Sequence, residues 1–574
     1  MKDFCKNKTW LILILLLAVS LRCFGLNWDQ NQHLHPDERF LTMVATAIEI
    51  PRNLAEYLNP QKSHLSPYNV GYPFFVYGTF PLYLIKILGE VTHLNTYETL
   101  PLLGRTFSAF FDIGVVFLIY QIGKKIYGEK AGQWGAFFYS LMALPIQLSH
   151  FFTVDTFLNF FLFLAFFFLI LLSENFTFWR IIGLGTAFGL ALACKISALY
   201  FLPIIGLAFL FQLTKKNFWH LSAGGSAFLL ISLLVFRFNQ PSAFANSNFL
   251  NWQPNPQLIA NLRELKTFDQ PDSWYPPSLQ WRQTTPWLFP LKNLLSWGLG
   301  WELGIISVMA LLFTLSQTIK KKAKPPLTAN WLILVWVLGL FIYQGGQYCK
   351  TMRYFLPLYP YLALISGLFV SEIFKKTAPK SKTFNLALQS LLITLSLIYP
   401  LSFMAIYTRP VTRVQASSWI YQNIPAGAKL AAEYWDDPLP LHLPGFSSSY
   451  QIQMLSLFDE ESPQKWTKIK SQLAQTDYII LSSNRLYGSI PQNPDRYFQT
   501  AQYYRDLFSG QLGFLKVAEF TSYPCFPPIG PKLFCFKDDQ AEEAFTVYDH
   551  PKVIIFQKQT SSFSQKQEEI NRGR

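Results

Sequence analysis

One short segment is dense in ionisable side chains for a chain with so few charges: residues 33–39 read HLHPDER. The adjacent carboxylates of Asp37 and Glu38 can supply a general base, provided that the backbone holds them in place. A proline followed by two acids also suits the first turn of a helix, where the acids face the positive end of the dipole. His33 and His35 with Asp37 could instead hold a divalent cation, although their spacing is not a strong ligand signature. We therefore expect a helix start that fixes Asp37 and Glu38.

A further acid and three cations lie at the ends of apolar stretches elsewhere in the chain. Asp155, in TVDTFLNFF, is an isolated acid at the start of one stretch. Ionisable groups at membrane depth are costly and usually functional, although Asp155 could also cap a helix. Arg105, Lys195 and Arg353 begin or interrupt other stretches. Cations in such places suit a phosphate group, but each one alone could also reach for lipid headgroups.

These side chains must be positioned by apolar helices. A bilayer core is crossed by about 20 apolar residues of helix, because a helix satisfies its own backbone hydrogen bonds. The stretch 180–213 could form one long helix or two short ones that break near Lys195. Counted with a break, the apolar stretches number eleven and run roughly over 10–26, 105–123, 133–150, 155–172, 180–194, 196–213, 219–238, 299–318, 330–347, 354–374 and 384–407. We expect an all-α polytopic membrane domain of about eleven transmembrane helices.

The composition agrees with a membrane protein. Of the 574 residues, 51% are hydrophobic and 14% are charged, whereas an average soluble domain carries about 25% charged residues. A disordered chain and a conventional soluble enzyme are therefore excluded. The net charge of +14 would suggest nucleic acid in a soluble protein. Here most of the excess lies in short connections between apolar stretches, so no nucleic-acid partner is needed.

The basic connections predict the orientation in the membrane. Cytoplasmic loops carry an excess of lysine and arginine. Short basic segments alternate along the chain with longer connections that are poorer in lysine and arginine, namely the loops 27–104 and 239–298. The basic segments are the N-terminus, 123–130, 214–219, 320–324 and 375–382. We therefore expect a protein of the plasma membrane whose N-terminus is cytoplasmic. The two long loops and the C-terminal tail are expected on the exterior side.

The tail has a different character from the membrane domain, which we place at 1–408. A helix is expected over 462–475, and strands are expected over 428–433, 477–483 and 552–557. We therefore expect a small α/β domain over 409–560, followed by a disordered terminus over 561–574. Cys525 and Cys535 flank a proline-rich loop and, in an oxidising exterior, could form a disulfide or remain as thiols.

These motifs, in this order and on one side of the membrane, resemble a known family. The acidic pair at 37–38, GRTFSAFF at 104–111, Asp155 with its aromatics, Lys195 in ALACKISALYFLP and RYFLPLYP at 353–360 carry the resemblance. Over residues 10–410 the chain is similar to lipid-carrier-dependent glycosyltransferases of the GT-C fold. It is nearest to family 39, which includes protein O-mannosyltransferases and aminoarabinose transferases of lipid A. The tail resembles those of uncharacterised bacterial members and lacks the repeat domains of eukaryotic O-mannosyltransferases, which puts a protein acceptor in doubt.

The resemblance implies an inverting transfer of a sugar from a polyprenyl-phosphate donor to an acceptor hydroxyl on the exterior face. Asp37 would be the general base, and Glu38 would orient it or help to hold a cation. Asp155 would position the donor or the acceptor. The donor phosphate would be neutralised by Arg105, Lys195 and Arg353. The acceptor would be a glycan, a lipid or a protein.

Two other classes of function stay open at this point. A secondary transporter would show two related halves and broken helices at the midplane, and the sequence shows no internal repeat. A polymerase or ligase of cell-envelope glycans would use the same donor with a larger acceptor. No Walker-type phosphate loop, HExxH, paired CxxC or GxSxG motif is present. The sequence does not identify the sugar, the acceptor, the exact lipid, a metal requirement or the oligomeric state.

Overall fold

The computed structural model describes residues 2–214, 218–320, 327–377, 381–447 and 449–559. The predicted disordered terminus, 561–574, lies outside these residues. The chain forms two compact units. The helical unit comprises Met1–Asn27, His35–Thr267 and Pro286–Leu401, and the sheet unit comprises Trp28–Leu34, Phe268–Thr285 and Ser402–Arg574.

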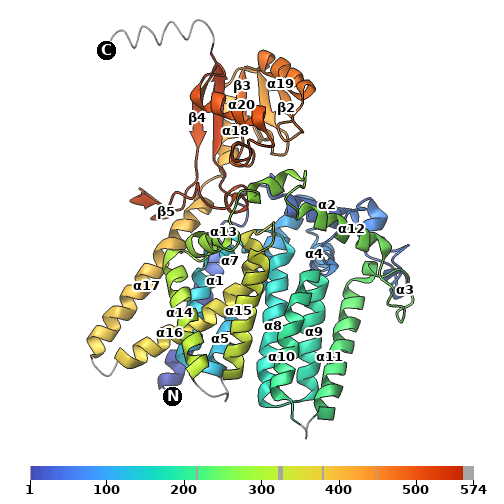
Figure 1. Ribbon diagram of the computed structural model, residues 1–574, viewed down its shortest axis with the longest axis vertical. Helices are drawn as coiled ribbons and strands as arrows, with labels where there is room; N and C mark the ends of the chain where they lie inside the picture. Colours follow the sequence, from blue (N-terminus) through green and yellow to red (C-terminus); the bar gives the residue numbers. More distant parts are fainter. Residues whose placement is uncertain (1, 215–217, 321–326, 378–380, 448, 560–574) are drawn as a thin grey trace. The chain divides into compact units, whose positions relative to one another are not determined.

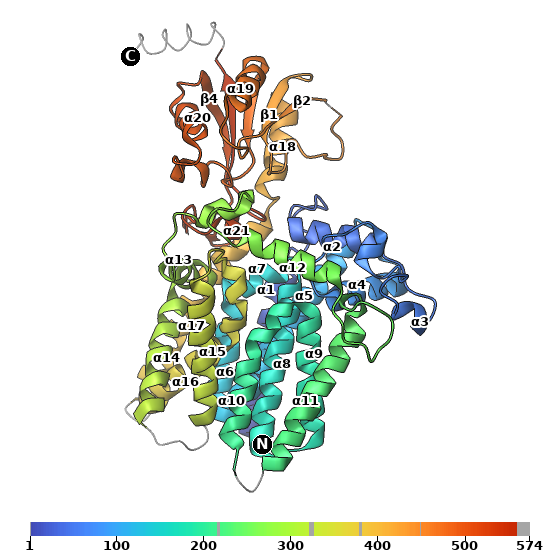
Figure 2. The same cartoon turned by 45° about the vertical axis from the view of Figure 1, so that its right-hand side comes forward.

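Long apolar helices make up most of the helical unit, and each predicted apolar stretch coincides with one helix or with two consecutive ones. Neighbours such as α9 and α11 lie side by side in two views (Figures 1 and 2). The helices are α1 (Lys2–Cys23), α5 (Leu100–Tyr127), α6 (Glu129–Leu141), α7 (Ala143–Ser149), α8 (Val154–Glu174), α9 (Phe178–Cys194), α10 (Leu202–Gln212), α11 (Phe218–Asn239), α14 (Trp301–Lys320), α15 (Leu327–Gly345), α16 (Tyr359–Thr377) and α17 (Lys382–Met404).

The helices agree with a polytopic membrane domain. In the described part of the chain, six helical segments are long and apolar enough to cross a membrane, and four further apolar helices are shorter. The polytopic all-α architecture is thus confirmed, and the count of eleven spans stays a prediction. The stretch 180–213 forms two helices: α9 ends at Cys194, and the 3-10 helix η2 (Ile196–Phe201) leads into α10. The break falls at Lys195, whose backbone is extended.

Both long connecting loops, 27–104 and 239–298, contain helices of their own. The helix α2 (Pro36–Ala47) begins at Pro36, as the sequence predicts, and is capped by His35. The search for membrane spans in the sequence does not predict the helix α4 (Thr79–Thr92), because its 14 residues are too few to cross a bilayer. The remaining elements are α3 (Leu54–Tyr57), η1 (Pro67–Val70), α4 (Thr79–Thr92), η3 (Pro241–Ala243), α12 (Pro256–Phe268), η4 (Pro276–Trp281), α13 (Leu288–Asn293), η5 (Leu294–Gly298) and η6 (Met352–Leu358).

The sheet unit has the predicted mixed α/β fold. Its five-stranded sheet has the order β2-β1-β3-β7-β4, with β2, β1 and β3 parallel and β7 antiparallel to both β3 and β4. Cys525 and Cys535 are disulfide-bonded across the small β5–β6 sheet. The elements are η7 (Ala405–Thr408), α18 (Thr412–Asn423), β1 (Lys429–Glu433), β2 (Gln451–Leu455), α19 (Pro463–Gln475), β3 (Tyr478–Leu481), η8 (Ile490–Gln492), α20 (Phe498–Ser509), β4 (Phe514–Phe520), β5 (Cys525–Phe526), β6 (Phe534–Cys535), α21 (Glu543–Thr546) and β7 (Val553–Lys558).

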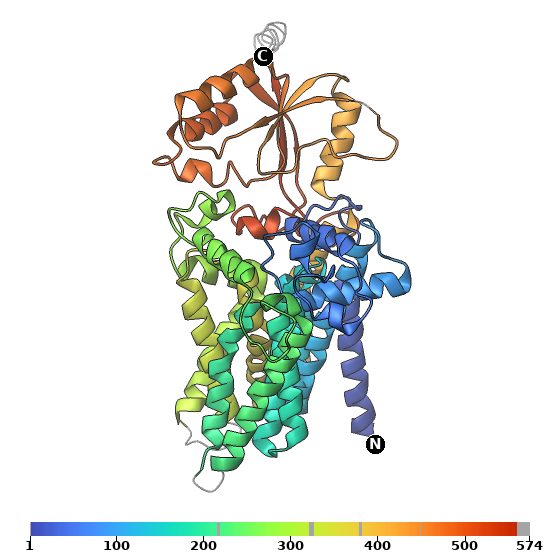
Figure 3. The same ribbon diagram turned by 90° about the vertical axis from the view of Figure 1, so that its right-hand side faces the viewer.

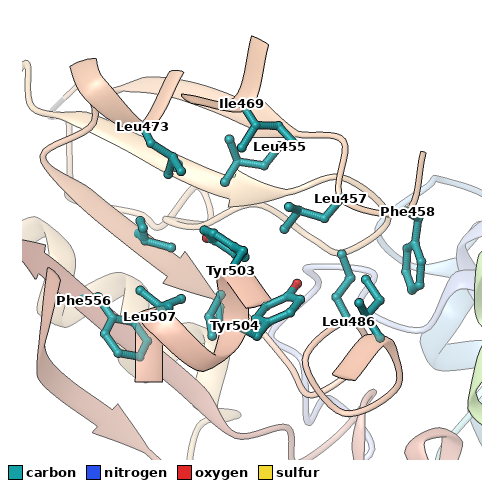
Figure 4. Packing of buried hydrophobic residues seen from close by; sticks show 14 of the residues in the cluster. Leu455, Leu457, Phe458, Ile469, Leu473, Leu486, Tyr503, Tyr504, Leu507 and Phe556 are labelled. Carbon is teal, nitrogen blue, oxygen red and sulfur yellow. The ribbon is translucent and has the colours of Figure 1, made fainter. Parts of the chain in front are cut away.

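Alternate residues of the strands face opposite sides of this sheet, so each face has its own hydrophobic core. In β3, Ile479 packs in the cluster with α19 and α20, whereas its neighbour Ile480 packs in the cluster with α18. Figure 3 shows α19 and α20 on one side of the sheet and α18 on the other, and Figure 4 shows Tyr503, Leu507 and Phe556 within the first cluster. The sheet is thus a central layer between helices.

The sheet unit begins before the predicted position 409. The ring of Phe403 packs on Phe545, and the Tyr407 hydroxyl donates a hydrogen bond of 2.8 Å to Asp549. These contacts attach the end of α17 and η7 to the sheet unit, so that the division falls between Leu401 and Ser402.

Candidate active site

Each predicted acid forms an ion pair with one of the predicted cations, and all three pairs lie in the helical unit. Residues from five separate regions of the chain are brought together in this way. The pairs are Glu38 with Arg105, Asp37 with Arg353, and Asp155 with Lys195. The sequence identifies these six residues as candidates, and the tertiary structure decides which of them are partners.

The Glu38–Arg105 pair is buried, and both side chains make several hydrogen bonds. Nε and one terminal nitrogen of Arg105 donate to the two Glu38 oxygens at 2.9 and 2.5 Å, and the Phe152 amide donates to Glu38 at 2.7 Å. Arg105 also donates to the carbonyl of Leu26 at 2.7 Å. The side chains are 0% and 1% exposed. A bidentate pair of this kind fixes geometry, so it holds α2 against α5 and against the segment that precedes α8.

The Asp37–Arg353 pair is different because both side chains remain accessible. The Arg353 guanidinium donates to the Asp37 carboxylate, and the side chains are 25% and 22% exposed respectively. Tyr77 also hydrogen-bonds the Asp37 carboxylate. Burial by itself would raise the pKa of Asp37, but Arg353, with help from His35 and Tyr77, holds it well below its usual range. Asp37 is therefore ionised at neutral pH.

The Asp155–Lys195 pair fixes the break between α9 and η2. The Lys195 ammonium donates to Asp155 at 2.9 Å, with the lysine side chain 23% exposed and the acid 7% exposed. Asp155 lies in the first turn of α8, whose cap position is Thr153. An acid in the first turn also interacts favourably with the helix dipole. Asp155 is thus held by both the Lys195 ammonium and the N-terminal end of α8, while the Lys195 side chain remains partly accessible.

Two contacts bring the Asp37–Arg353 and Asp155–Lys195 pairs into one neighbourhood. Tyr354 follows Arg353 in η6, and the Lys195 ammonium lies 4.7 Å from the centre of the Tyr354 ring. On the other side, Gly78 follows Tyr77, and the Gly78 amide donates to the carbonyl of Cys194 at 2.9 Å. We define the candidate site as these two ion pairs with Tyr77 and Tyr354.

The two histidines of the 33–39 segment do not form a metal cluster with Asp37. His35 accepts a hydrogen bond of 3.3 Å from the Glu38 amide through Nδ1, and its ring lies 4.5 Å from that of Phe151. His33 is also buried. Among the described residues, no group of three His, Cys, Asp or Glu side chains could hold a metal ion.

Sequence reasoning missed a further buried pair, Arg22 with Asp112. Arg22 Nε donates to Asp112 at 2.6 Å, and the Tyr139 hydroxyl donates to the same carboxylate at 2.5 Å. Both charged side chains are 0% exposed, so this pair joins α1, α5 and α6 without access to a ligand. The available signal was a charge inside each of two predicted spans. Tyr77 and Tyr354 carried no comparable signal, since tyrosine is common throughout this chain.

Comparisons with known proteins support the fold of the chain and relate one segment of it to a protein family. The sequence profile of the dolichyl-phosphate-mannose-protein mannosyltransferase family matches residues 100–236, a range that includes Arg105, Asp155 and Lys195. No curated protein matches the chain. Among solved structures, the oligosaccharyltransferase AglB from Archaeoglobus fulgidus, in complex with an inhibitory peptide and a dolichol-phosphate, has a TM-score of 0.54 at 15% identity, with 87% of this chain and 72% of that chain covered.

A second similar structure is ArnT from Cupriavidus metallidurans bound to undecaprenyl phosphate. Its TM-score is 0.43 at 12% identity, with 84% of this chain and 94% of that chain covered. The chain is a polytopic membrane protein with the GT-C fold, and its residues 100–236 match the dolichyl-phosphate-mannose-protein mannosyltransferase family.

Proposed function

We propose that the chain transfers a sugar from a polyprenyl-phosphate donor to an acceptor hydroxyl on the exterior face of the plasma membrane, with inversion at the anomeric carbon. The observation that carries this proposal is the accessible Asp37–Arg353 pair beside Lys195. It offers a carboxylate for a hydroxyl proton and two cations for a phosphate. The dolichol-phosphate bound to the archaeal relative is a lipid phosphate of the proposed class.

Asp37 is the proposed general base. Its carboxylate takes the proton of the acceptor hydroxyl while the hydroxyl oxygen attacks the anomeric carbon. Glu38 is the less suitable of the two adjacent acids, because its oxygens already accept from Arg105 and from the Phe152 amide. Arg353 restrains the basicity of Asp37 in the free protein. When a donor phosphate engages Arg353, that restraint weakens and Asp37 becomes a stronger base.

Arg353 and Lys195 are the proposed phosphate ligands. The bond between the anomeric carbon and the phosphate oxygen breaks, and its electron pair stays on the polyprenyl phosphate. Two cations near that oxygen stabilise the developing charge. Asp155 positions Lys195 at 2.9 Å. Arg105 has a different role from the predicted one under this proposal, because its contacts with Glu38 and Leu26 make it a positioning residue for α2.

The proposed orientation follows the basic connections, with the N-terminus in the cytoplasm and the sheet unit outside. The acceptor is a glycan, a lipid or a protein hydroxyl. A reporter enzyme fused after residue 410 should therefore be active outside the cell. A reporter that is active only in the cytoplasm would contradict the orientation.

The base assignment is tested with Asp37→Asn, which keeps the size of the side chain and removes its basicity. Mass spectrometry of lipid extracts should show a polyprenyl-phosphate sugar that accumulates in a deletion strain and disappears when the wild-type chain is restored. Asp37→Asn should leave the accumulation in place at normal protein levels. Glu49→Gln is the matched control, since Glu49 is an exposed acid just after α2. Clearance of the lipid-linked sugar by Asp37→Asn would contradict the assignment.

A further inference from the structure

A disulfide-closed hairpin in the sheet unit has a firmly held backbone. Cys525 and Cys535 are bonded and lie opposite each other in the β5–β6 pair. The Leu533 amide donates to the Phe526 carbonyl at 2.8 Å, and the rings of Phe526 and Phe534 stack with their centres 5.7 Å apart. A covalent bond, strand pairing and ring stacking thus hold the hairpin, which we call the 525–535 hairpin.

The tip of the 525–535 hairpin is apolar and exposed. Ile529, Leu533 and Phe534 are 71%, 76% and 45% exposed, respectively. Gly530 makes the turn with a φ of +86°, which glycine adopts without strain. Removing a large apolar side chain from water is worth about 1.5–3 kcal/mol. A constrained loop that presents several such side chains together marks an interaction surface.

The base of the hairpin is attached where the last apolar helix ends. The Thr408 hydroxyl donates to the Pro528 carbonyl at 3.2 Å, and Arg409 Nε donates to the Ser522 hydroxyl at 3.0 Å. No charged residue lies between Lys382 and Arg409, and this stretch contains α17 and η7. An apolar helix that crosses a bilayer reaches its surface near the first charge that follows. The hairpin is therefore attached at the end of the apolar helix α17, where the chain is expected to leave the bilayer.

Basic side chains accompany the apolar tip. Lys532 is exposed, and its ammonium donates to the carbonyls of Pro527 and Pro528 at 3.0 and 2.5 Å. Partial burial and the charge of Arg409 lower the pKa of Lys532. Cations near a membrane surface are attracted to anionic headgroups by about 1 kcal/mol each. Apolar side chains next to cations are typical of segments that lie in the membrane interface.

We propose that the 525–535 hairpin inserts its apolar tip into the headgroup region of the membrane that α17 crosses, and so holds the sheet unit at the lipid surface. The membrane is the expected occupant because the hairpin is attached at the point where the chain leaves it and because the adjacent cations complement anionic lipids. This inference concerns lipid contact and does not depend on the proposed sugar transfer.

Lipid photolabelling of the full chain tests the proposal. The protein is placed in nanodiscs of phosphatidylcholine and phosphatidylglycerol that contain a phospholipid with a diazirine near the start of the acyl chain. After illumination, mass spectrometry should find lipid adducts on residues 529–534. Phe498 is the matched control, because it is 69% exposed on α20 of the same unit. Adducts on the hairpin at no higher frequency than at Phe498 would overturn the proposal.

Variants separate the contributions of the apolar tip and of the Lys532 charge to lipid contact. Ile529→Ser combined with Leu533→Ser should lower adduct formation on Phe534 by about tenfold or more, because the transfer free energy of two large side chains is lost. Phe498→Ser should leave it unchanged, and both variants should keep the wild-type melting temperature, because the replaced side chains are exposed. Lys532→Glu should reduce labelling in anionic nanodiscs but not in purely neutral ones. Unchanged labelling of the double-serine variant, or cross-linking of the tip to a polypeptide in place of lipid, would refute lipid insertion.

Discussion

The ammonium of Lys195 lies 4.7 Å from the centre of the Tyr354 ring, and Tyr354 directly follows Arg353. Through this contact the partner of Asp155 and the partner of Asp37 share one aromatic ring. The two cations are thereby kept near each other although they lie 158 positions apart in the sequence (353 minus 195). A phosphate that contacts both would be held by groups whose positions are already set.

The ring of Tyr354, and not its hydroxyl, should therefore matter for transfer. Tyr354→Phe keeps the cation–π contact and should retain most of the activity. Tyr354→Leu removes the contact, which is worth about 0.5–2 kcal/mol, and should lower the rate of sugar transfer by roughly threefold to thirtyfold. The rate is followed by mass spectrometry as consumption of the accumulated lipid-linked sugar in membranes. Equal rates for the leucine and phenylalanine variants would contradict this role.

Glu38→Gln should destabilise the helical unit more than it alters the chemistry. The substitution leaves the buried Arg105 guanidinium without its anionic partner, and breaking a buried pair costs about 3–5 kcal/mol. We expect a markedly lower melting temperature in detergent, measured by intrinsic fluorescence. Combining Glu38→Gln with Arg105→Met should recover part of the loss, since the unpaired charge is then removed. Glu49→Gln is the control, and a wild-type melting temperature for Glu38→Gln would exclude the positioning role.

Gly78→Ala should disturb the candidate site through backbone displacement. A Cβ atom at Gly78 would lie 2.0 Å from the carbonyl oxygen of Ala193, so the Gly78 segment and the end of α9 would have to move apart. Because Tyr77 and Lys195 lie on these two segments, we expect a loss of sugar transfer of at least tenfold, equivalent to about 1.4 kcal/mol. Gly206→Ala is the control, because nothing lies within 4 Å of the added atom. Similar activities for the two variants would contradict the close approach.

The sheet unit should lose stability as the pH rises from about 5 to 8, because of Glu433. Burial raises the pKa of Glu433 to about 8 from an ordinary value of 4.5, Asp436 adds to the shift, and the hydrogen bond from Tyr504 opposes it. The folded unit therefore holds the proton more tightly than the unfolded chain. Its stabilising contribution is complete below pH 4.5 and is lost as the pH rises through 8.

Hydrogen–deuterium exchange of the β1 amides, corrected for intrinsic rates, measures this effect. Between about pH 5 and 8, the free energy of opening obtained from the wild-type protection factors should fall by roughly 2–4 kcal/mol. For Glu433→Gln, this free energy should depend less on pH and should exceed the wild-type value above pH 8. Glu519→Gln, at a surface acid of β4 paired with Lys516, is the control and should follow the wild-type profile. Parallel profiles for wild type and Glu433→Gln would rule out Glu433 as the titrating group.

Much of the fold follows from local patterns in the sequence. The apolar stretches predict the long helices because length and hydropathy are properties of each segment alone, and short apolar runs predict β3 and β7 in the same way. The strand β2 was not predictable, because its residues are largely exposed and it depends on pairing with β1. The helix α4 is short and apolar, so the sequence could not distinguish it from a buried loop.

The residue types of the candidate site were determined by the sequence, and their roles were decided by the tertiary structure. Asp37 and Glu38 are adjacent in the chain and equivalent by any local pattern. In α2, consecutive side chains point about 100° apart, because a helix has 3.6 residues per turn. Glu38 therefore faces α5 and is buried against Arg105, whereas Asp37 faces Arg353 and stays accessible. Only the packing of helices from distant parts of the chain could assign those partners.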